Sequence, residues 1–280
     1  MNNPKIIPAD SVRIKYNEAR KDMKLEQHSH NFYQIIYIKE GLIEFKINGK
    51  KYTAGKNSLI FISNLESHEL KVLEYPYKRY YVLIKPHYLH SLISEPVLVS
   101  IFKHRPAHFN HVIALRPEDS VYVSNTFKSM YDEASTSMPF WEFTLCSYFF
   151  LLLTFLFRKY KDSFPITTIN KPMETILDVQ KYIEQHFTEN IVLEEVSKRF
   201  YSNKFYMSHL FKKITGFSFK EYLILQRILK SKELLINSSE SITHVGLYSG
   251  FNNVNHFIRI FRQYEGITPY QYRKKHAAYQ

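Results

Sequence analysis

The stretch GFNNVNHFIRIFRQYEGITPYQYR, which runs from Gly250 to Arg273, decides how the carboxy-terminal part of this 280-residue chain folds. From Phe257 to Tyr264 its apolar side chains recur every three or four positions, which is the spacing of an amphipathic helix. The segment FRQYEGITP at 261–269 repeats the pattern of FKKITGFSF at 211–219, fifty residues earlier. The sequence therefore predicts one helical unit that is present twice.

Each copy of the repeat follows a shorter helical pattern and a brief polar turn. The shorter helices are expected at Leu193–Phe200 and Ile242–Tyr248, and the turns follow directly. A helix, a tight turn and a second helix make a helix-turn-helix unit. We therefore predict two such units, at about 193–214 and about 242–264.

The segment between the two units, from Phe219 to about Leu235, is rich in strong helix formers and predicts a long connecting helix. At 1.5 Å per residue, a helix of these 17 residues spans roughly 26 Å. With the flanking helices added, the second helices of the units can lie about 34 Å apart, which is one turn of B-DNA. One chain can then reach two successive major grooves.

The second helix of each unit has a polar and basic face opposite its apolar stripe. The expected stripes comprise Met207, Leu210, Phe211 and Ile214 in the first unit and Phe257, Ile260, Phe261 and Tyr264 in the second. Arginine pairs with guanine, asparagine with adenine and lysine with phosphate, so such a face suits the major groove. A single basic face is commonly just solvated, whereas two copies at fixed spacing favour DNA. The candidate DNA-contacting residues are Lys204, Phe205, Ser208, His209, Lys212, Asn252, Asn253, Asn255, His256, Arg259 and Arg262.

Composition narrows the class of protein. Lysine and arginine number 38 against 26 acidic residues, a net charge of +12, which favours an anionic partner. The seven glycines form neither a dinucleotide-binding nor a Walker A loop, so we expect neither a phosphoryl-transfer enzyme nor a dinucleotide oxidoreductase. The single cysteine, Cys146, forbids an internal disulfide and fits a reducing cytosol. The first residues lack the apolar core of a secretory signal, so a cytoplasmic location is expected.

The amino-terminal part reads as a small β-structure. Between about residues 25 and 85, short runs alternate polar and apolar side chains, as Ile43 to Ile47 do, and turn residues separate them. Asn48-Gly49 is a strong hairpin signal because both central positions of a type I′ turn need positive φ. Several short strands at this spacing predict a small barrel or sandwich.

Two helices and a linker follow the strands. Val121, Phe127, Met130 and Tyr131 are expected on one side of a helix that ends near Ala134. A second helix, at 140–159, contains the fifteen-residue apolar run Phe143–Phe157. A spanning helix needs about 20 apolar residues, so we expect a buried helix at a homodimer interface, with a membrane span as the lesser alternative. The polar segment 161–172, with two prolines, predicts a linker.

The carboxy-terminal residues resemble the paired helix-turn-helix domain of the AraC/XylS family of transcription regulators. The residues that carry the resemblance are Gly250, Phe251, Phe257, Arg259, Phe261, Gly266, Thr268, Pro269, Tyr272 and Arg273. This resemblance implies sequence-specific binding to double-stranded promoter DNA, usually as an activator that contacts RNA polymerase. Gly246 stands where that family usually has alanine and is expected to loosen the second unit by about 1 kcal/mol. Ile258 occupies a position that usually faces the bases.

Histidines mark a candidate sensor site among the strands. His28 and His30 share one face of a strand by their spacing, and a third imidazole, His68, can reach them from a neighbouring strand. Three imidazoles are a donor set that zinc or iron uses. The segment 28–68 resembles a cupin barrel, and metal-binding cupins typically have glutamate where Gln34 stands. Because a neutral amide is a poor substitute for that carboxylate, we expect no metal here. Instead, His28, His30, Gln34, Tyr37 and His68 are expected to bind a small polar, sugar-like effector.

The sequence thus predicts a multidomain α and β chain. Residues 1–116 form a cupin-like effector-sensing barrel, 117–160 a helical pair at the dimer interface, 161–172 a linker, and 173–280 an all-α DNA-binding domain. The predicted function is an effector-controlled, sequence-specific transcription regulator, an activator without catalytic residues or cofactor and without a membrane partner. The alternative is a metal-dependent cupin enzyme with an appended helical domain, which metal analysis distinguishes.

Overall fold

A computed structural model describes residues 12–277 with the exception of residues 22, 107 and 137. The expected domain ends at residues 1 and 280 lie outside the described residues. Most of the amino-terminal segment in which no secretory signal is expected also lies outside them. The chain divides into two compact units, one within residues 12–168 and the other made mainly of residues 169–277. The division falls inside the expected linker.

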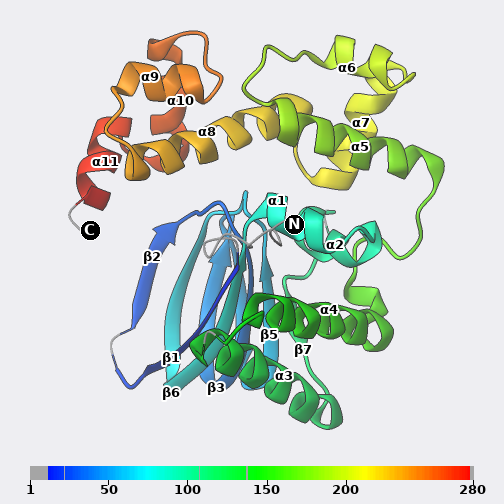
Figure 1. The fold of residues 1–280 in the computed structure, drawn as a ribbon, viewed down its shortest axis with the longest axis vertical. Helices are drawn as coiled ribbons and strands as arrows, with labels where there is room; N and C mark the ends of the chain where they lie inside the picture. The colour runs from blue at the N-terminus through cyan, green and yellow to red at the C-terminus, as the bar shows by residue number, and fades with distance from the viewer. Residues whose placement is uncertain (1–11, 22, 107, 137, 278–280) are drawn as a thin grey trace. The chain divides into compact units, whose positions relative to one another are not determined.

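The first unit is built on one bent, seven-stranded antiparallel sheet with four helices (Figure 1). Its strands are β1 (Val12–Ala19), β2 (Lys24–His28), β3 (Tyr33–Ile47), β4 (Lys50–Gly55), β5 (Ser58–Ile62), β6 (His68–Ile84) and β7 (Val112–Ala114). Its helices are α1 (Pro86–Leu92), α2 (Pro96–Lys103), α3 (Pro117–Thr136) and α4 (Trp141–Lys159). The chain then makes a short 3-10 turn, η1 (Lys161–Ser163).

The two longest strands give the sheet its shape. Strands run in the order β1-β6-β3-β5-β7, with β2 on β6 and β4 on β3, so this path of described strands is open at β1 and β7. The register of β3 against β6 shifts between Ile38 and Ile43, and Gly41, with φ +93°, lies at this irregularity. A Cβ on Gly41 would lie 2.7 Å from the Glu74 carbonyl oxygen, so only glycine fits. The cupin-like fold class is confirmed, in the form of a strongly bent open sheet.

Both faces of β3 are buried, each in its own core. Tyr33, Ile35 and Tyr37 pack with residues of α1 to α4, whereas Ile36 and Ile38 pack inside the bend of the sheet. The predicted turn at Asn48-Gly49 is present between β3 and β4, with φ of 47° and 83°. These two positive φ values are what a type I′ turn requires.

Helices α3 and α4 pack against each other and cover one face of the sheet. The prediction for Val121 is wrong: it is 65% exposed, because the buried face of α3 is centred on Val123, Phe127 and Met130. Among the described residues, α4 is the one helix whose length and apolar composition would allow it to cross a membrane. Its buried side includes Leu145, Cys146, Phe149, Leu152, Leu153 and Leu156 in the core of this unit.

In the described residues of the second compact unit, all regular secondary structure is helical (Figure 1). Its helices are α5 (Lys171–His186), α6 (Leu193–Arg199), α7 (Lys204–Thr215), α8 (Phe219–Asn237), α9 (Ile242–Tyr248), α10 (Val254–Glu265) and α11 (Pro269–Ala277). Helices α6 and α7 form the first helix-turn-helix unit, and α9 and α10 the second. The long helix α8 packs against α7, α9 and α11, as expected of the connector.

Local signals explain why the helices of the repeat begin and end where they do. Asn203 caps α7 and Asn253 caps α10: the side chain of Asn203 accepts two backbone N–H groups of the first turn, and that of Asn253 accepts one. Gly216 and Gly266 end the same helices with φ of 84° and 75°, in the left-handed region that favours glycine. Ser218 begins α8 in a reciprocal capping arrangement with Glu221.

Candidate DNA-binding surface and sensor site

Helix α10 presents a polar face opposite a buried one. Phe257, Ile260 and Phe261 are buried in the core of the second helix-turn-helix unit. Asn255, His256, Arg259 and Arg262 are exposed, as the sequence predicts. Tyr264 was expected in the buried stripe, but it is 39% exposed, because it lies near the end of the helix, away from that core.

Helix α7 has the same division. Met207 and Phe211 are buried, whereas Lys204, Phe205, His209 and Lys212 are exposed and Ser208 is half-buried. Phe205 is 79% exposed, which is unusual for a phenylalanine and suits contact with base methyl groups. A shallow hollow on this face is lined by Phe205, Ser208, His209, Lys212 and Lys213. Lys213 is an exposed cation of this surface that the helical-face analysis missed, although it directly follows Lys212.

Two of the candidate residues already have structural partners. The side-chain oxygen of Asn253 accepts a hydrogen bond from the backbone N–H of His256 at 3.0 Å, so Asn253 first of all positions α10. Lys204 lies 3.3 Å from the Glu194 carboxylate of α6, and its hydrogen bond lowers the pKa of Glu194. Asn252 is exposed in the turn just before α10.

The imidazole of His256 is kept neutral. Burial lowers its pKa, and the cations Arg259, Lys220 and Arg227 lower it further. A neutral imidazole has one donor and one acceptor nitrogen, so His256 can pair with either kind of group on a base edge.

The structure explains two positions of the second helix-turn-helix unit, Gly246 and Ile258, at which this sequence differs from the residues usual in the family it resembles. A Cβ on Gly246 would lie 2.9 Å from a ring carbon of Phe257, so glycine lets α9 approach α10 closely. Gly246 therefore allows α9 and α10 to pack closely, and the structure gives no sign of the loosening expected from a glycine at this position. Ile258 is half-buried and packs against the same core, so only part of its side chain can face DNA.

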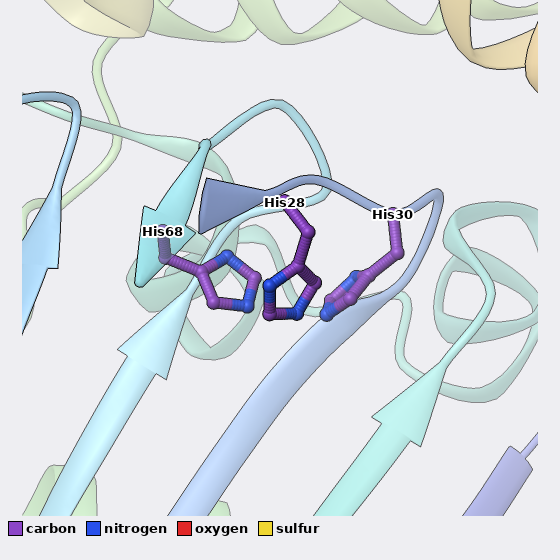
Figure 2. Close-up of side chains that lie close together, drawn as sticks. All are labelled: His28, His30 and His68. Atoms are coloured by element: carbon purple, nitrogen blue, oxygen red, sulfur yellow. The ribbon is translucent and has the colours of Figure 1, made fainter. Parts of the chain in front are cut away.

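Three histidines converge in the first unit (Figure 2). His28 ends β2 and pairs across the sheet with His68, the first residue of β6. Their ring centroids are 4.3 Å apart, and that of His30 is 5.0 Å from His68. One ligand nitrogen from each ring lies within 4.8 Å of the others. The structure thus brings together the three histidines that the strand spacing predicted.

Hydrogen bonds fix the orientation of these rings. His28 Nδ1 lies 2.8 Å from the Glu26 carbonyl oxygen, and His68 Nδ1 lies 3.1 Å from that of Glu66. A carbonyl only accepts, so the Nδ1 of each of these two rings donates the hydrogen bond. Burial, and then the neighbouring His30 and His28, lower the pKa of His68 well below its ordinary value of 6.5. His68 is therefore neutral near pH 7.

Gln34 joins this group in a way the sequence did not reveal. Its side-chain oxygen lies 3.2 Å from His30 Nε2, so the buried amide orients an imidazole. Three imidazoles are chemically suited to hydrogen-bond the oxygens of a polar molecule, and imidazole nitrogens are also ligands that zinc prefers.

Tyr37 does not belong to this cluster, contrary to expectation. It is 1% exposed, its ring stacks on Phe127 of α3 at 5.3 Å, and its hydroxyl donates to Asn57 at 3.1 Å. Because successive side chains of a strand alternate in direction, Tyr37 and Gln34 point to opposite faces of β3. Tyr37 is a core residue in this structure.

Comparisons with known proteins agree with both units. Residues 196–275 match a helix-turn-helix domain model, and residues 10–127 match the model of the AraC-like ligand binding domain. The HTH-type transcriptional activator RhaS of Klebsiella pneumoniae is 24% identical over 252 residues, covering 89% of this chain and 87% of RhaS. The uncharacterized HTH-type transcriptional regulator YdiP of Escherichia coli is 23% identical, covering 91% of this chain and 83% of YdiP.

Other similarities cover less of the partner or show only the fold. The regulatory protein PocR of Salmonella typhimurium is 35% identical over 95 residues, and the chain spans 31% of the length of PocR. Solved structures of ToxT from Vibrio cholerae superpose with a TM-score of 0.58 at 16% identity, covering 94% of this chain and 98% of ToxT.

The two family models fall on the two units in the order that the repeat and the histidine-bearing strands predict. The named full-length relatives are transcription regulators, so the alternative of a metal-dependent enzyme is not supported. The chain belongs to the AraC family of transcription regulators, with an AraC-like ligand-binding domain followed by a helix-turn-helix DNA-binding domain.

Proposed function

We propose that this protein binds promoter DNA sequence-specifically by placing α7 and α10 in two successive major grooves. The observation that carries the proposal is the exposed face of α10, where Asn255, His256, Arg259 and Arg262 stand opposite the buried phenylalanines. Asparagine and arginine discriminate adenine and guanine by paired hydrogen bonds. On α7, Lys204, Phe205, Ser208, His209 and Lys212 form the corresponding surface.

We further propose that a small polar effector controls this binding and is held by His28, His30, Gln34 and His68. Oriented imidazoles can hydrogen-bond the hydroxyl groups of such a molecule. Phe45 stacks on His68 with ring centroids 5.8 Å apart, and Phe32 lies edge-on to His30 at 6.0 Å. Aromatic surfaces beside polar groups suit a sugar-like molecule.

The remaining assignments concern assembly and output. Helices α3 and α4 leave Val121, Tyr122, Phe150 and Leu151 exposed, and we propose that this apolar surface is the homodimer interface. The protein acts in the cytoplasm as an activator that contacts RNA polymerase. The relative RhaS carries the name of a transcriptional activator, which supports the proposed sign of regulation.

The DNA-binding proposal is tested with a duplex that the wild-type protein selects from a random-sequence library. Binding should weaken steeply with salt, with a slope in log units of about −0.9 for each phosphate neutralised. Arg259→Ala should cost about 1–3 kcal/mol and relax the preference at one base pair. The matched control is Lys181→Ala, which removes an exposed cation of α5, off both recognition helices.

Anisotropy titrations of the wild type and both variants decide the matter. Arg259→Ala binding that is as tight and as selective as wild type would remove Arg259 from the interface. A wild type that selects no sequence at all, or a Lys181→Ala loss equal to that of Arg259→Ala, would leave only non-specific attraction to DNA.

A further inference from the structure

Arg227, near the middle of α8, contacts the loop that leads into the first helix-turn-helix unit and the turn inside the second helix-turn-helix unit. Its Nε donates a hydrogen bond to the Phe187 carbonyl oxygen at 2.7 Å, and its Nη2 donates to the Glu189 carbonyl oxygen at 2.7 Å. Both carbonyls belong to the loop that leads from α5 to α6, directly before the first helix-turn-helix unit. The guanidinium carbon also lies 5.9 Å from the centre of the Phe251 ring, in the turn of the second unit.

The chemistry of this contact favours a firm connection. Phe187 is the residue at the carboxy-terminal end of α5, where backbone carbonyls lack partners within the helix and the helix dipole favours a cation. The planar guanidinium holds two of the loop carbonyls at once, which an ammonium group cannot do with the same geometry. Burial lowers the pKa of Arg227, which records how far this cation is removed from water.

The contact continues to both recognition helices. Phe251 is buried, and its ring centroid lies 5.1 Å from that of Phe257 in α10. On the other side, α5 packs against α7. Arg227 is therefore linked to α10 through one aromatic ring and to α7 through one packed helix.

The α5–α6 loop and the turn of the second helix-turn-helix unit also lie in close contact beside Arg227. A Cβ on Gly250, in the turn of the second unit, would lie 2.7 Å from Thr188 Cα, 2.8 Å from the Phe187 oxygen and 3.0 Å from Arg227 Nε. Gly250 has φ +89°, so glycine is needed here both for its backbone conformation and for the close approach.

We infer that Arg227 is a positioning residue that sets the distance and helical phase at which α7 and α10 meet DNA, and so decides which half-site spacing the protein accepts. This inference rests on the proposed binding of α7 and α10 to DNA. Two linked binding modules gain affinity only when the link places both on their sites at once. A stiff link therefore gives a strict spacing preference, and a loosened link gives a tolerant one.

The test compares wild type with Arg227→Ala and Arg227→Lys on three probes. The first is the duplex selected by the wild-type protein, the second has five base pairs inserted between its half-sites, and the third keeps only the half-site of α10. Five base pairs turn one half-site to the opposite side of the duplex, so wild type should lose about 100-fold in affinity on the second probe.

For Arg227→Ala we expect weaker binding to the selected duplex by about tenfold and a spacing penalty that falls below about tenfold, because only simultaneous engagement is impaired. Affinity for the third probe should stay within about twofold of wild type, which a general loss of folding would not allow. Arg227→Lys keeps the charge and the aliphatic stem, and it should show the same change in spacing preference to a smaller degree.

A wild-type spacing penalty in both variants would overturn the inference, as would an equal loss of affinity on all three probes. If Arg227→Ala does not fold, Arg227→Lys decides by the same criterion. Absence of sequence-specific binding by wild type would refute the proposed function itself, which is a distinguishable result.

Discussion

Gly250 and Gly266 form a matched pair that tests the packing between the second helix-turn-helix unit and the α5–α6 loop. Both have positive φ, +89° and +75°, so alanine at either position costs about 1–2 kcal/mol from backbone strain alone. A Cβ on Gly266 meets nothing within 4 Å, whereas one on Gly250 lies 2.7 Å from Thr188 Cα. Backbone atoms cannot move aside as a side chain does, so overpacking adds about 1–3 kcal/mol for Gly250→Ala. We expect a loss of about 1–2 kcal/mol for Gly266→Ala and about 2–5 kcal/mol for Gly250→Ala.

The assay is urea unfolding followed by two signals. Circular dichroism at the helix band reports both compact units, because α1 to α4 contribute to it beside α5 to α11, and a loss seen in this signal alone belongs to residues 169–277. Fluorescence of Trp141, the only tryptophan of the sequence, reports the first unit and serves as an internal control that should not shift. Equal losses for both variants, or a larger loss for Gly266→Ala, would refute the close packing at Gly250.

Three further predictions concern the amino-terminal compact unit, residues 12–168. The pKa of His68 in the folded chain lies below 6.5, so the stability that its neutral form contributes is complete above about pH 7 and is lost as the pH falls through the folded-state pKa. The denaturant midpoint of the wild type should therefore drop between pH 7.5 and pH 5, and the midpoint of His68→Gln should drop less. Equal drops would contradict this role of His68. Leu151→Glu places a charge in the exposed apolar surface of α4, and sedimentation velocity should show that it converts dimers to monomers. The control Lys128→Glu, an exposed change on α3 outside that apolar surface, should leave the dimer intact. A monomeric wild type would contradict the proposed interface. His28→Ala should abolish the response to effector while purified wild type carries no stoichiometric metal by mass spectrometry; one zinc or iron per chain, lost in His28→Ala, would make the histidine cluster a metal site instead.

The sequence predicted the helix-turn-helix units well because their signals are local. Capping residues such as Asn203 and Asn253, and the glycines that end α7 and α10, lie within a few positions of the helices they bound. The hairpin at Asn48-Gly49 is equally local, since its two residues alone supply the positive φ values.

Facing directions were harder to predict where both sides of an element are buried. The first six residues of β3 are all buried, so no polar alternation reveals which face each side chain occupies. For this reason the sequence alone does not separate Tyr37, which packs on α3, from the side chains that face the histidines. Val121 was misplaced for a related reason, because α3 has apolar side chains beyond its buried face.

Long-range contacts left no signal in the sequence. Arg227 bonds to carbonyls about forty residues away, and nothing in the run of α8 distinguishes this arginine from a solvated one. Gly246 likewise looked like a weak point of α9, because its close contact with Phe257 depends on the packing of two helices. Such features follow from tertiary structure alone.

The central claim is that two recognition helices of one chain read two major grooves on one side of the duplex. Methylation interference at guanine N7 on the selected duplex tests it most directly, because N7 lies in the major groove. The account predicts two interfering clusters separated by about 10 base pairs, one of which loses its effect in Arg259→Ala. A single cluster, or two clusters on opposite sides of the duplex, would contradict it.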